Sequence, residues 1–184
     1  MLVSHFRSRE QLTGLLLELP ALTTALERRQ ANAVPQLVDM LRRSEHILLT
    51  SRMRQAAGLA ASRAALAAVR LEEVDSRIRT RERRCALQQI GLIGAALSEA
   101  LTPVEQRIES ARLTARQLLQ LVAASGAISL NGDRDLMGLC ERIWQLALGH
   151  DQLKSLAMQI RIALNRQDIL LLLAEEIDPA DFSQ

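Results

Sequence analysis

The last third of the chain carries apolar residues at alternating intervals of three and four positions. In an α-helix this spacing places residues on one line along the helix surface. The pattern predicts a single helix over residues 134–176, about 60 Å long at a rise of 1.5 Å per residue. Ten of its twelve positions are apolar, and the line consists of Leu136, Leu139, Ile143, Leu146, His150, Leu153, Ala157, Ile160, Leu164, Gln167, Leu171 and Ala174.

The amino-acid composition of the whole chain also favours helices. Leu, Ala, Arg, Gln and Glu dominate the 184 residues, which include only eight Gly, four Pro, two Phe, one Trp and no Tyr. Straight-chain residues favour helices, whereas strands are enriched in β-branched and aromatic residues. We therefore predict an all-α protein, folded as an elongated helical bundle with coiled-coil-like packing.

Four more helices account for the rest of the sequence. One is a second long helix of about 40 residues, and three are shorter pieces of about 22 residues. The long helix covers 60–100, and the shorter ones cover 9–31, 36–57 and 103–124.

The expected arrangement is a single all-helical domain over residues 1–184. The helix positions also allow a subdivision into a hairpin, a long-helix bundle and a short acidic tail, over 1–57, 60–176 and 177–184.

Local residue patterns mark two helix starts. Ser8 followed by Gln11 is a capping box, which predicts a helix beginning at Arg9. Thr102 followed by Pro103 predicts another beginning, because Thr caps helix N-termini and Pro is tolerated in the first turn.

Other residues interrupt or end the predicted helices. We expect Pro20 to kink or divide the first helix, and Gly58 to mark a break or bend within 36–100. Gly126 follows Ser125 at the end of the apolar seam of 103–124, and it predicts the end of that helix.

The charge of the chain is distributed unevenly along its length. Residues 1–60 carry eight Arg and five acidic residues, 61–124 carry ten and seven, and 125–184 carry five basic and nine acidic residues. Arg supplies 22 of the 23 basic residues. Codon usage in a GC-rich bacterial genome explains this bias, and selection for bidentate Arg contacts is the alternative.

Several classes of function lack their usual residues. The three His are scattered, no Cys pair is closely spaced, and no glycine-rich phosphate loop is present. We therefore expect no metal, no cofactor, no enzymatic activity and no small-molecule substrate. Cys85 and Cys140 lie far apart in the sequence, which favours reduced thiols in a cytoplasmic protein.

Neither a membrane span nor a signal peptide is predicted. The longest uncharged run in the apolar middle of the chain, 85–98, has fourteen residues, fewer than the roughly 20 that a membrane helix needs. The N-terminus lacks the apolar core of a signal peptide.

His150 and Asp151 form the only pair that is typical of phosphotransfer helices, with Lys154 one turn further on. In such helices an imidazole nitrogen takes the phosphoryl group and a carboxylate acts as a base. The apolar line, however, predicts that His150 faces the core, next to a kink at Gly149. We therefore interpret it as a partly buried structural histidine, and keep phosphotransfer as an alternative.

The densest group of charges contains five arginines in eight residues, namely Arg77, Arg79, Arg81, Arg83 and Arg84. Such a group can follow a phosphate backbone or contact an acidic protein surface. It can also be a solvated helix face that pairs with the acidic residues at 72–75 or with the acidic C-terminus, which is the interpretation we favour. Helical geometry spreads these arginines around much of the helix.

The predicted C-terminal helix becomes apolar on all sides near its end. A helix that packs on one side only does not satisfy this pattern. The tip is therefore either surrounded by other helices or docked into a partner or a second copy. The candidate interface residues are Ile162, Ile169, Leu170, Leu172 and Leu173.

These observations together predict a non-enzymatic protein–protein interaction module, an adaptor, chaperone-like or regulatory subunit of a bacterial assembly. Its expected partner is another protein or a second copy of itself. The first alternative is an Arg-rich accessory factor that associates with nucleic acid, and the second is a phosphotransfer bundle that uses His150.

Overall fold

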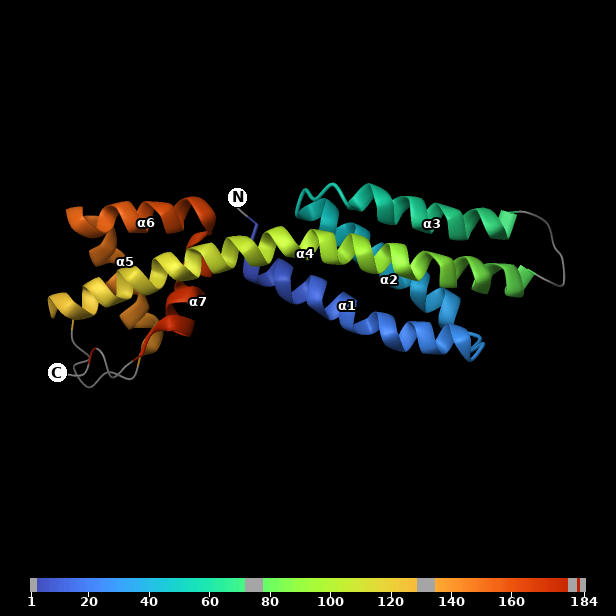
Figure 1. Ribbon diagram of the computed structural model, residues 1–184, viewed down its shortest axis with the longest axis horizontal. Helices are drawn as coiled ribbons and strands as arrows, with labels where there is room; N and C mark the ends of the chain where they lie inside the picture. The colour runs from blue at the N-terminus through green and yellow to red at the C-terminus, as the bar shows by residue number, and fades with distance from the viewer. Residues whose placement is uncertain (1–2, 72–77, 129–134, 179–181, 183–184) are drawn as a thin grey trace. The chain divides into compact units, whose positions relative to one another are not determined.

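Helices make up the regular secondary structure of the described part of the chain, which contains no strand. The computed structural model describes residues 3–71, 78–128, 135–178 and 182 (Figure 1). The helices are α1 (His5–Glu27), α2 (Ala33–Thr50), α3 (Ala56–Leu71), α4 (Ile78–Ser125), α5 (Leu136–Gly149), α6 (Asp151–Ala163) and α7 (Arg166–Glu176). The predicted all-α class and the packing of a long helix in a bundle are confirmed.

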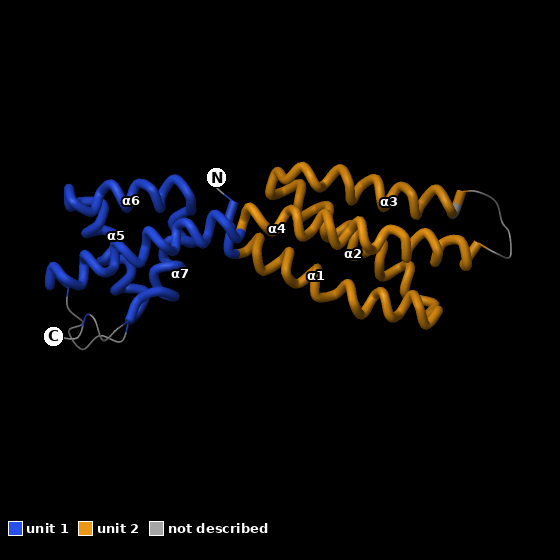
Figure 2. Tube along the Cα trace, in the orientation of Figure 1, with its two compact units in different colours: residues 1–6, 105–184 blue, residues 7–104 orange. Residues whose placement is uncertain are grey.

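The chain divides into two compact units (Figure 2). Unit 2 comprises residues 7–104, and unit 1 comprises residues 1–6 together with 105–184. Helix α4 contributes its first part to unit 2 and its second part to unit 1. The prediction of one domain over 1–184, with its subdivision near residue 57, stays a prediction.

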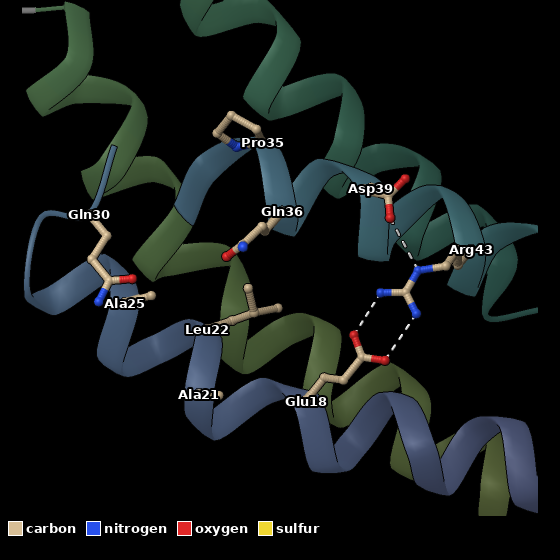
Figure 3. A pocket seen from close by; sticks show the side chains of 9 residues that line it. All are labelled: Glu18, Ala21, Leu22, Ala25, Gln30, Pro35, Gln36, Asp39 and Arg43. Atoms are coloured by element: carbon tan, nitrogen blue, oxygen red, sulfur yellow. Dashed lines mark hydrogen bonds and ion pairs between the residues drawn. The ribbon is translucent and has the colours of Figure 1, made fainter. Parts of the chain in front are cut away.

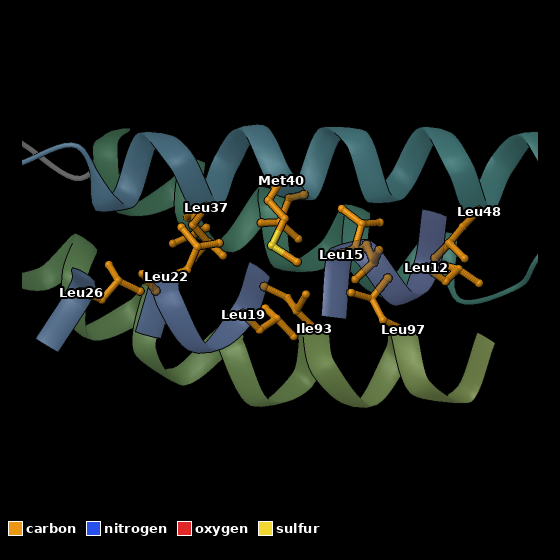
Figure 4. Packing of buried hydrophobic residues seen from close by; sticks show 14 of the residues in the cluster. Leu12, Leu15, Leu19, Leu22, Leu26, Leu37, Met40, Leu48, Ile93 and Leu97 are labelled. Atoms are coloured by element: carbon orange, nitrogen blue, oxygen red, sulfur yellow. The ribbon is translucent and has the colours of Figure 1, made fainter. Parts of the chain in front are cut away.

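Unit 2 buries the apolar faces of α1, α2, α3 and the first part of α4 in one core (Figure 4). Leucines three or four residues apart line the inner side of α1, as the helical period requires. They meet Met40 from α2 and Ile93 from α4. The largest fully buried residues of this core are Leu12, Leu26, Leu37, Met40, Leu41, Leu48, Leu59, Ile93 and Leu97.

Unit 1 packs α5, α6 and α7 around the second part of α4. The inner face of α4 in this unit is formed by the predicted seam, whose members Ile108, Ala111, Ala115, Leu118 and Val122 are all buried; Val104, the first member of the seam, is buried as the last residue of unit 2. Arg112 and Arg116 of α4 form ion pairs with Glu175 and Glu176 at the end of α7. Part of the acidic C-terminus is therefore neutralised by α4.

The predicted single helix over 134–176 is wrong, because the structure divides it into α5, α6 and α7. His150 and Leu164 both adopt extended backbone conformations. The interruption at His150 costs few hydrogen bonds, since its N–H donates to Leu146 O at 2.9 Å and its carbonyl accepts from Leu153 N at 3.0 Å. Each short helix keeps its own apolar face, so the spacing of apolar residues does not reveal the breaks.

The predicted long helix over 60–100 and the predicted start at Pro103 are also wrong. Helix α3 ends at Leu71, and α4 then runs from Ile78 through Pro103 to Ser125. The hydroxyl of Thr102 donates to Ser98 O at 3.0 Å, within the helix, and does not cap a new one. An interior proline removes one backbone donor, and its ring crowds the carbonyl four residues earlier, but the packing of α4 outweighs this cost.

Of three other predicted helix boundaries, the structure agrees with one and differs from two. Helix α4 ends at Ser125, as Gly126 predicts, and Gly126 has a positive φ of 61°. Helix α1 is continuous through Pro20, so the predicted division there is absent. The break expected near Gly58 lies upstream, between Thr50 and Ala56.

Helix α1 begins at His5, one turn before the predicted start at Arg9. The side chain that supports this earlier start comes from α7, which no local pattern in the sequence could indicate.

Candidate functional site

A groove lies between α1 and α2 in unit 2. Its volume is ≈ 710 Å³, and it is open to solvent along one side (Figure 3). The lining residues are Glu18, Ala21, Leu22, Ala25, Gln30, Pro35, Gln36, Asp39 and Arg43.

The groove exists because α1 presents short side chains there. Ala21 and Ala25 lie one turn apart and leave space that larger residues would fill. Leu22 and Ala25 are buried and form an apolar floor, and Pro35 adds an exposed apolar residue to the lining. The remaining lining residues are polar or charged, so the groove has an apolar floor and a polar rim.

A three-residue ion-pair cluster forms one part of the rim (Figure 3). Arg43 donates to the carboxylate of Glu18 with both terminal nitrogens, at 2.9 Å and 2.6 Å. Its Nε lies 3.3 Å from Asp39 Oδ2. These hydrogen bonds lower the pKa of Glu18 and raise the pKa of Arg43. Because the side chains are 42–68% exposed, the pairs add little stability and can accept other charged partners.

An uncharged strip of α1 borders the groove. Leu17 is the largest apolar residue in this strip and is 74% exposed. Every exposed residue of α1 between Thr13 and Thr24 is uncharged, and the strip consists of Thr13, Gly14, Leu17, Pro20, Ala21 and Thr24. Exposed apolar surface next to a concave site is typical of protein-binding surfaces.

The structure places His150 on the surface, between α5 and α6. The prediction that it faces the core is wrong, because the helix ends at Gly149 and the apolar line is interrupted at this residue. Asp151 and Lys154, in the first turn of α6, are exposed as well. Phosphotransfer at His150 stays a prediction.

The Arg-rich segment lies at the beginning of α4. Arg79, Arg81 and Arg84 are exposed, Arg83 is half-buried, and Arg77 lies outside the described residues.

Of the acidic C-terminal residues that were the predicted partners of these arginines, two have other partners, and Asp181 lies outside the described residues. Glu175 and Glu176 pair with Arg112 and Arg116 instead. The acidic residues at 72–75, which were the other expected partners, lie outside the described residues.

The five candidate interface residues at the C-terminal tip are divided between the core and the surface. Ile169, Leu172 and Leu173 are at most 1% exposed and pack inside unit 1. Leu170 is half-buried, and Ile162 on α6 is 77% exposed. The all-round apolar pattern therefore arises mainly because other helices surround α7.

A buried carboxylate that the sequence analysis missed holds the start of α1. Asp168, fully buried in the first turn of α7, accepts hydrogen bonds from Ser4 Oγ and from the His5 backbone N–H, each at 2.6 Å. Asn165 Nδ2 donates to it at 3.2 Å. The charge is thereby stabilised by the N-terminal ends of two helices. The only local signal that could have indicated this site is the Asn165–Asp168 spacing, which is that of an N-cap.

The ring of His5 contacts Arg107, whose Nη1 lies 3.3 Å from His5 Nε2. Burial, together with the charge of Arg107, lowers the pKa of His5, and the charge of Asp168 opposes this shift. The hydroxyl of Ser4 donates to Asp168. A nucleophilic Ser would instead hydrogen-bond to the imidazole of a base. The cluster therefore holds the start of α1 against the first turn of α7.

Metal binding and thiol chemistry find no support in the described residues. These residues contain no group of three or more His, Cys, Asp or Glu side chains that could hold a metal ion. None of the described helices is long and apolar enough to cross a membrane. Burial raises the pKa of Cys85, and it raises the pKa of Cys140 to about 11, so both thiols are poor nucleophiles at neutral pH.

Comparison of the chain with protein-family models, with curated proteins and with solved structures finds no match. Any functional conclusion therefore rests on the surfaces described above.

Proposed function

We propose that the protein is a non-enzymatic binding module, and that it holds a segment of another protein in the α1–α2 groove. The observation that carries this proposal is the combination of an apolar floor, a polar rim and the adjoining uncharged strip of α1. An amphipathic segment buries its apolar side chains in such a groove and leaves its polar side chains at the rim.

Binding of a partner in the groove also costs little side-chain entropy. Two of the groove's lining residues, Leu22 and Ala25, already belong to the core of unit 2, so binding orders few side chains of the module itself. The exposed Leu17 lies on the same helix, where a partner that extends beyond the groove can cover it. Roles as an adaptor, as a chaperone-like protein or as a regulatory subunit in the bacterial cytoplasm are all compatible with this binding mode.

Ala21→Arg tests the proposal, because the long side chain would occupy the groove while its backbone stays in an exposed helical position. Tagged full-length protein is used to capture partners from its host, and the captured proteins are identified by mass spectrometry. We expect Ala21→Arg to lose a partner that the unmodified protein captures, with a decrease of about tenfold or more for a blocked central contact.

Ala61→Arg is the matched control, since Ala61 is an exposed alanine of a helix on another surface of unit 2. It should capture the partner as the unmodified protein does. If both variants retain every captured protein, or both lose them equally, the groove is not the binding site.

A further inference from the structure

One end of unit 2 gathers arginines from two segments that are distant in the sequence. Helix α1 ends there and α4 begins there (Figure 1). The described residues 27–30 and 78–84 include only two acidic side chains, Glu27 and Glu82. They include six arginines, which are Arg28, Arg29, Arg79, Arg81, Arg83 and Arg84.

The register of α1 against α4 places these two segments at the same level. The two helices are antiparallel, and a Cβ on Gly94 would lie 3.4 Å from Leu19 Cδ1. Arg29 lies ten residues after Leu19, and Arg84 lies ten residues before Gly94. Both are therefore displaced by about 15 Å in the same direction along the bundle. Arg28, Arg29, Arg81 and Arg84 are all exposed.

Four described carboxylates of unit 2 form ion pairs with arginines away from this end. Glu18 and Asp39 pair with Arg43, Glu45 pairs with Arg63 and Glu99 pairs with Arg54. The ion pairs of the described residues include none of the six arginines at the end.

The whole of residues 7–104 carries fifteen Arg and ten acidic residues, so unit 2 attracts anions.

We propose that this basic end, formed by Arg28, Arg29, Arg81 and Arg84, binds the phosphate backbone of a nucleic acid duplex without reading its sequence. Arg forms bidentate hydrogen bonds with phosphate, and neutralising phosphates releases bound counterions. Single-stranded nucleic acids are usually held by aromatic side chains that stack on the bases. Residues 7–104 contain no aromatic residue, which favours contacts to a duplex backbone.

This binding surface is separate from the function proposed for the groove, and neither proposal depends on the other. Residues 72–77, which the structure does not describe, are not included in the site.

Two double variants of the full-length protein test the inference. Arg29→Gly with Arg84→Gln removes two arginines from the basic end. Arg52→Gly with Arg42→Gln removes two exposed arginines elsewhere in unit 2. The pairs are matched, because Arg29 and Arg52 both have a positive φ that glycine adopts without strain. Binding of a 30-base-pair DNA duplex is measured by fluorescence anisotropy at several salt concentrations between about 50 and 200 mM, a range over which phosphate contacts strongly change affinity.

We expect the unmodified protein to bind the duplex with an affinity that falls steeply as salt rises. Each phosphate contact contributes roughly 0.9 to the slope of log affinity against log salt concentration. The first double variant should reduce that slope by about 2, whereas the second should leave it unchanged. Circular dichroism checks that both variants remain folded.

Three results would overturn the inference. The first is an absence of duplex binding at the lowest salt concentration, and the second is an equal loss of binding in both double variants. The third is a polyglutamate peptide that binds as tightly as the duplex and with the same dependence on Arg29 and Arg84, which would identify an acidic protein as the ligand.

Discussion

Arg29 and Arg52 each end a helix with a positive φ, of 60° and 55°. In both cases the hydrogen bonds are those of a Schellman motif. Gln30 N donates to Ala25 O at 3.0 Å after α1, and Met53 N donates to Leu48 O at 2.8 Å after α2. Glycine is the residue that adopts this conformation without a steric cost.

We therefore expect Arg29→Gly and Arg52→Gly each to raise the free energy of unfolding by about 0.5–1 kcal/mol. Urea denaturation followed by circular dichroism measures the change. Arg42→Gly is the control, because position 42 lies inside α2, where glycine should lower stability by about 1 kcal/mol. Lower midpoints for both capping variants would contradict the explanation.

Cys140 makes the stability of the protein depend on pH above neutrality. Burial raises the pKa of its thiol to about 11 in the folded chain, from a reference value of 9.0. Between these two pH values the unfolded thiol ionises while the folded thiol keeps its proton. The contribution to stability is therefore complete below about pH 9 and is lost as the pH rises toward 11.

The free energy of unfolding should accordingly fall between pH 8 and pH 10 by more in the unmodified protein than in Cys140→Ser. The chain has no Tyr and only one Lys, so few other groups titrate in this range. Equal pH dependence in the two proteins would show that the buried thiol does not ionise on unfolding as expected.

At the scale of the helix, Asp168 connects two elements that the sequence separates by more than 160 residues. Its carboxylate caps α1 from within the first turn of α7. We expect Asp168→Ala to lower the free energy of unfolding by about 2–4 kcal/mol, because it leaves the His5 N–H and the Ser4 hydroxyl without their acceptor.

Ser4→Ala removes only one of these hydrogen bonds and should cost about 1 kcal/mol. Thermal or urea unfolding of the two variants gives the comparison. If Asp168→Ala costs no more than Ser4→Ala, the carboxylate is not what holds the start of α1.

The two prolines of α2 and α4 should respond differently to replacement. Pro103 interrupts the backbone hydrogen bonds inside α4, whereas Pro35 lies in the first turn of α2, where its N–H would have no intrahelical partner. Pro103→Ala should therefore raise the free energy of unfolding by about 1–2 kcal/mol. Pro35→Ala should leave it nearly unchanged, and a gain of equal size in both would contradict this account.

At the scale of the whole molecule, each compact unit has a core of its own. Unit 2 is continuous in sequence, and its core involves α1 to α4. A fragment of residues 7–104 should therefore fold alone, with helical circular dichroism and a single cooperative urea transition.

The complementary fragment, residues 105–184, lacks Ser4 and His5, the partners of Asp168. It should be less stable than the same region in the full chain. An unfolded 7–104 fragment, or a 105–184 fragment that Asp168→Ala destabilises as much as the full chain, would contradict this division of the contacts.

The sequence was sufficient for properties that depend on near neighbours in a helix. The seam from Val104 to Val122 follows the helical period, and the structure buries it as predicted. Gly126 marks the end of α4 because only a residue that tolerates a positive φ fits there. The helical class follows from the same local preferences, summed over the chain.

The sequence did not predict the points at which a helix ends at a single residue and the chain changes direction. His150 and Leu164 end helices, but both occupy positions in the regular spacing of three and four residues. The breaks after α5 and α6 were therefore not visible in the sequence. Pro103 had the local features of a helix start, yet the packing of α4 overrides them.

What the sequence determined by itself is therefore the all-helical class, most of the apolar faces and the basic character of residues 77–84. Only the tertiary structure decided where the chain turns, that α1 and α2 enclose a groove, and that Arg29 lies level with Arg84. The physical reason is range: helical periodicity and residue preferences act over a few residues, whereas grooves and charge clusters form from segments that meet only after the core is packed.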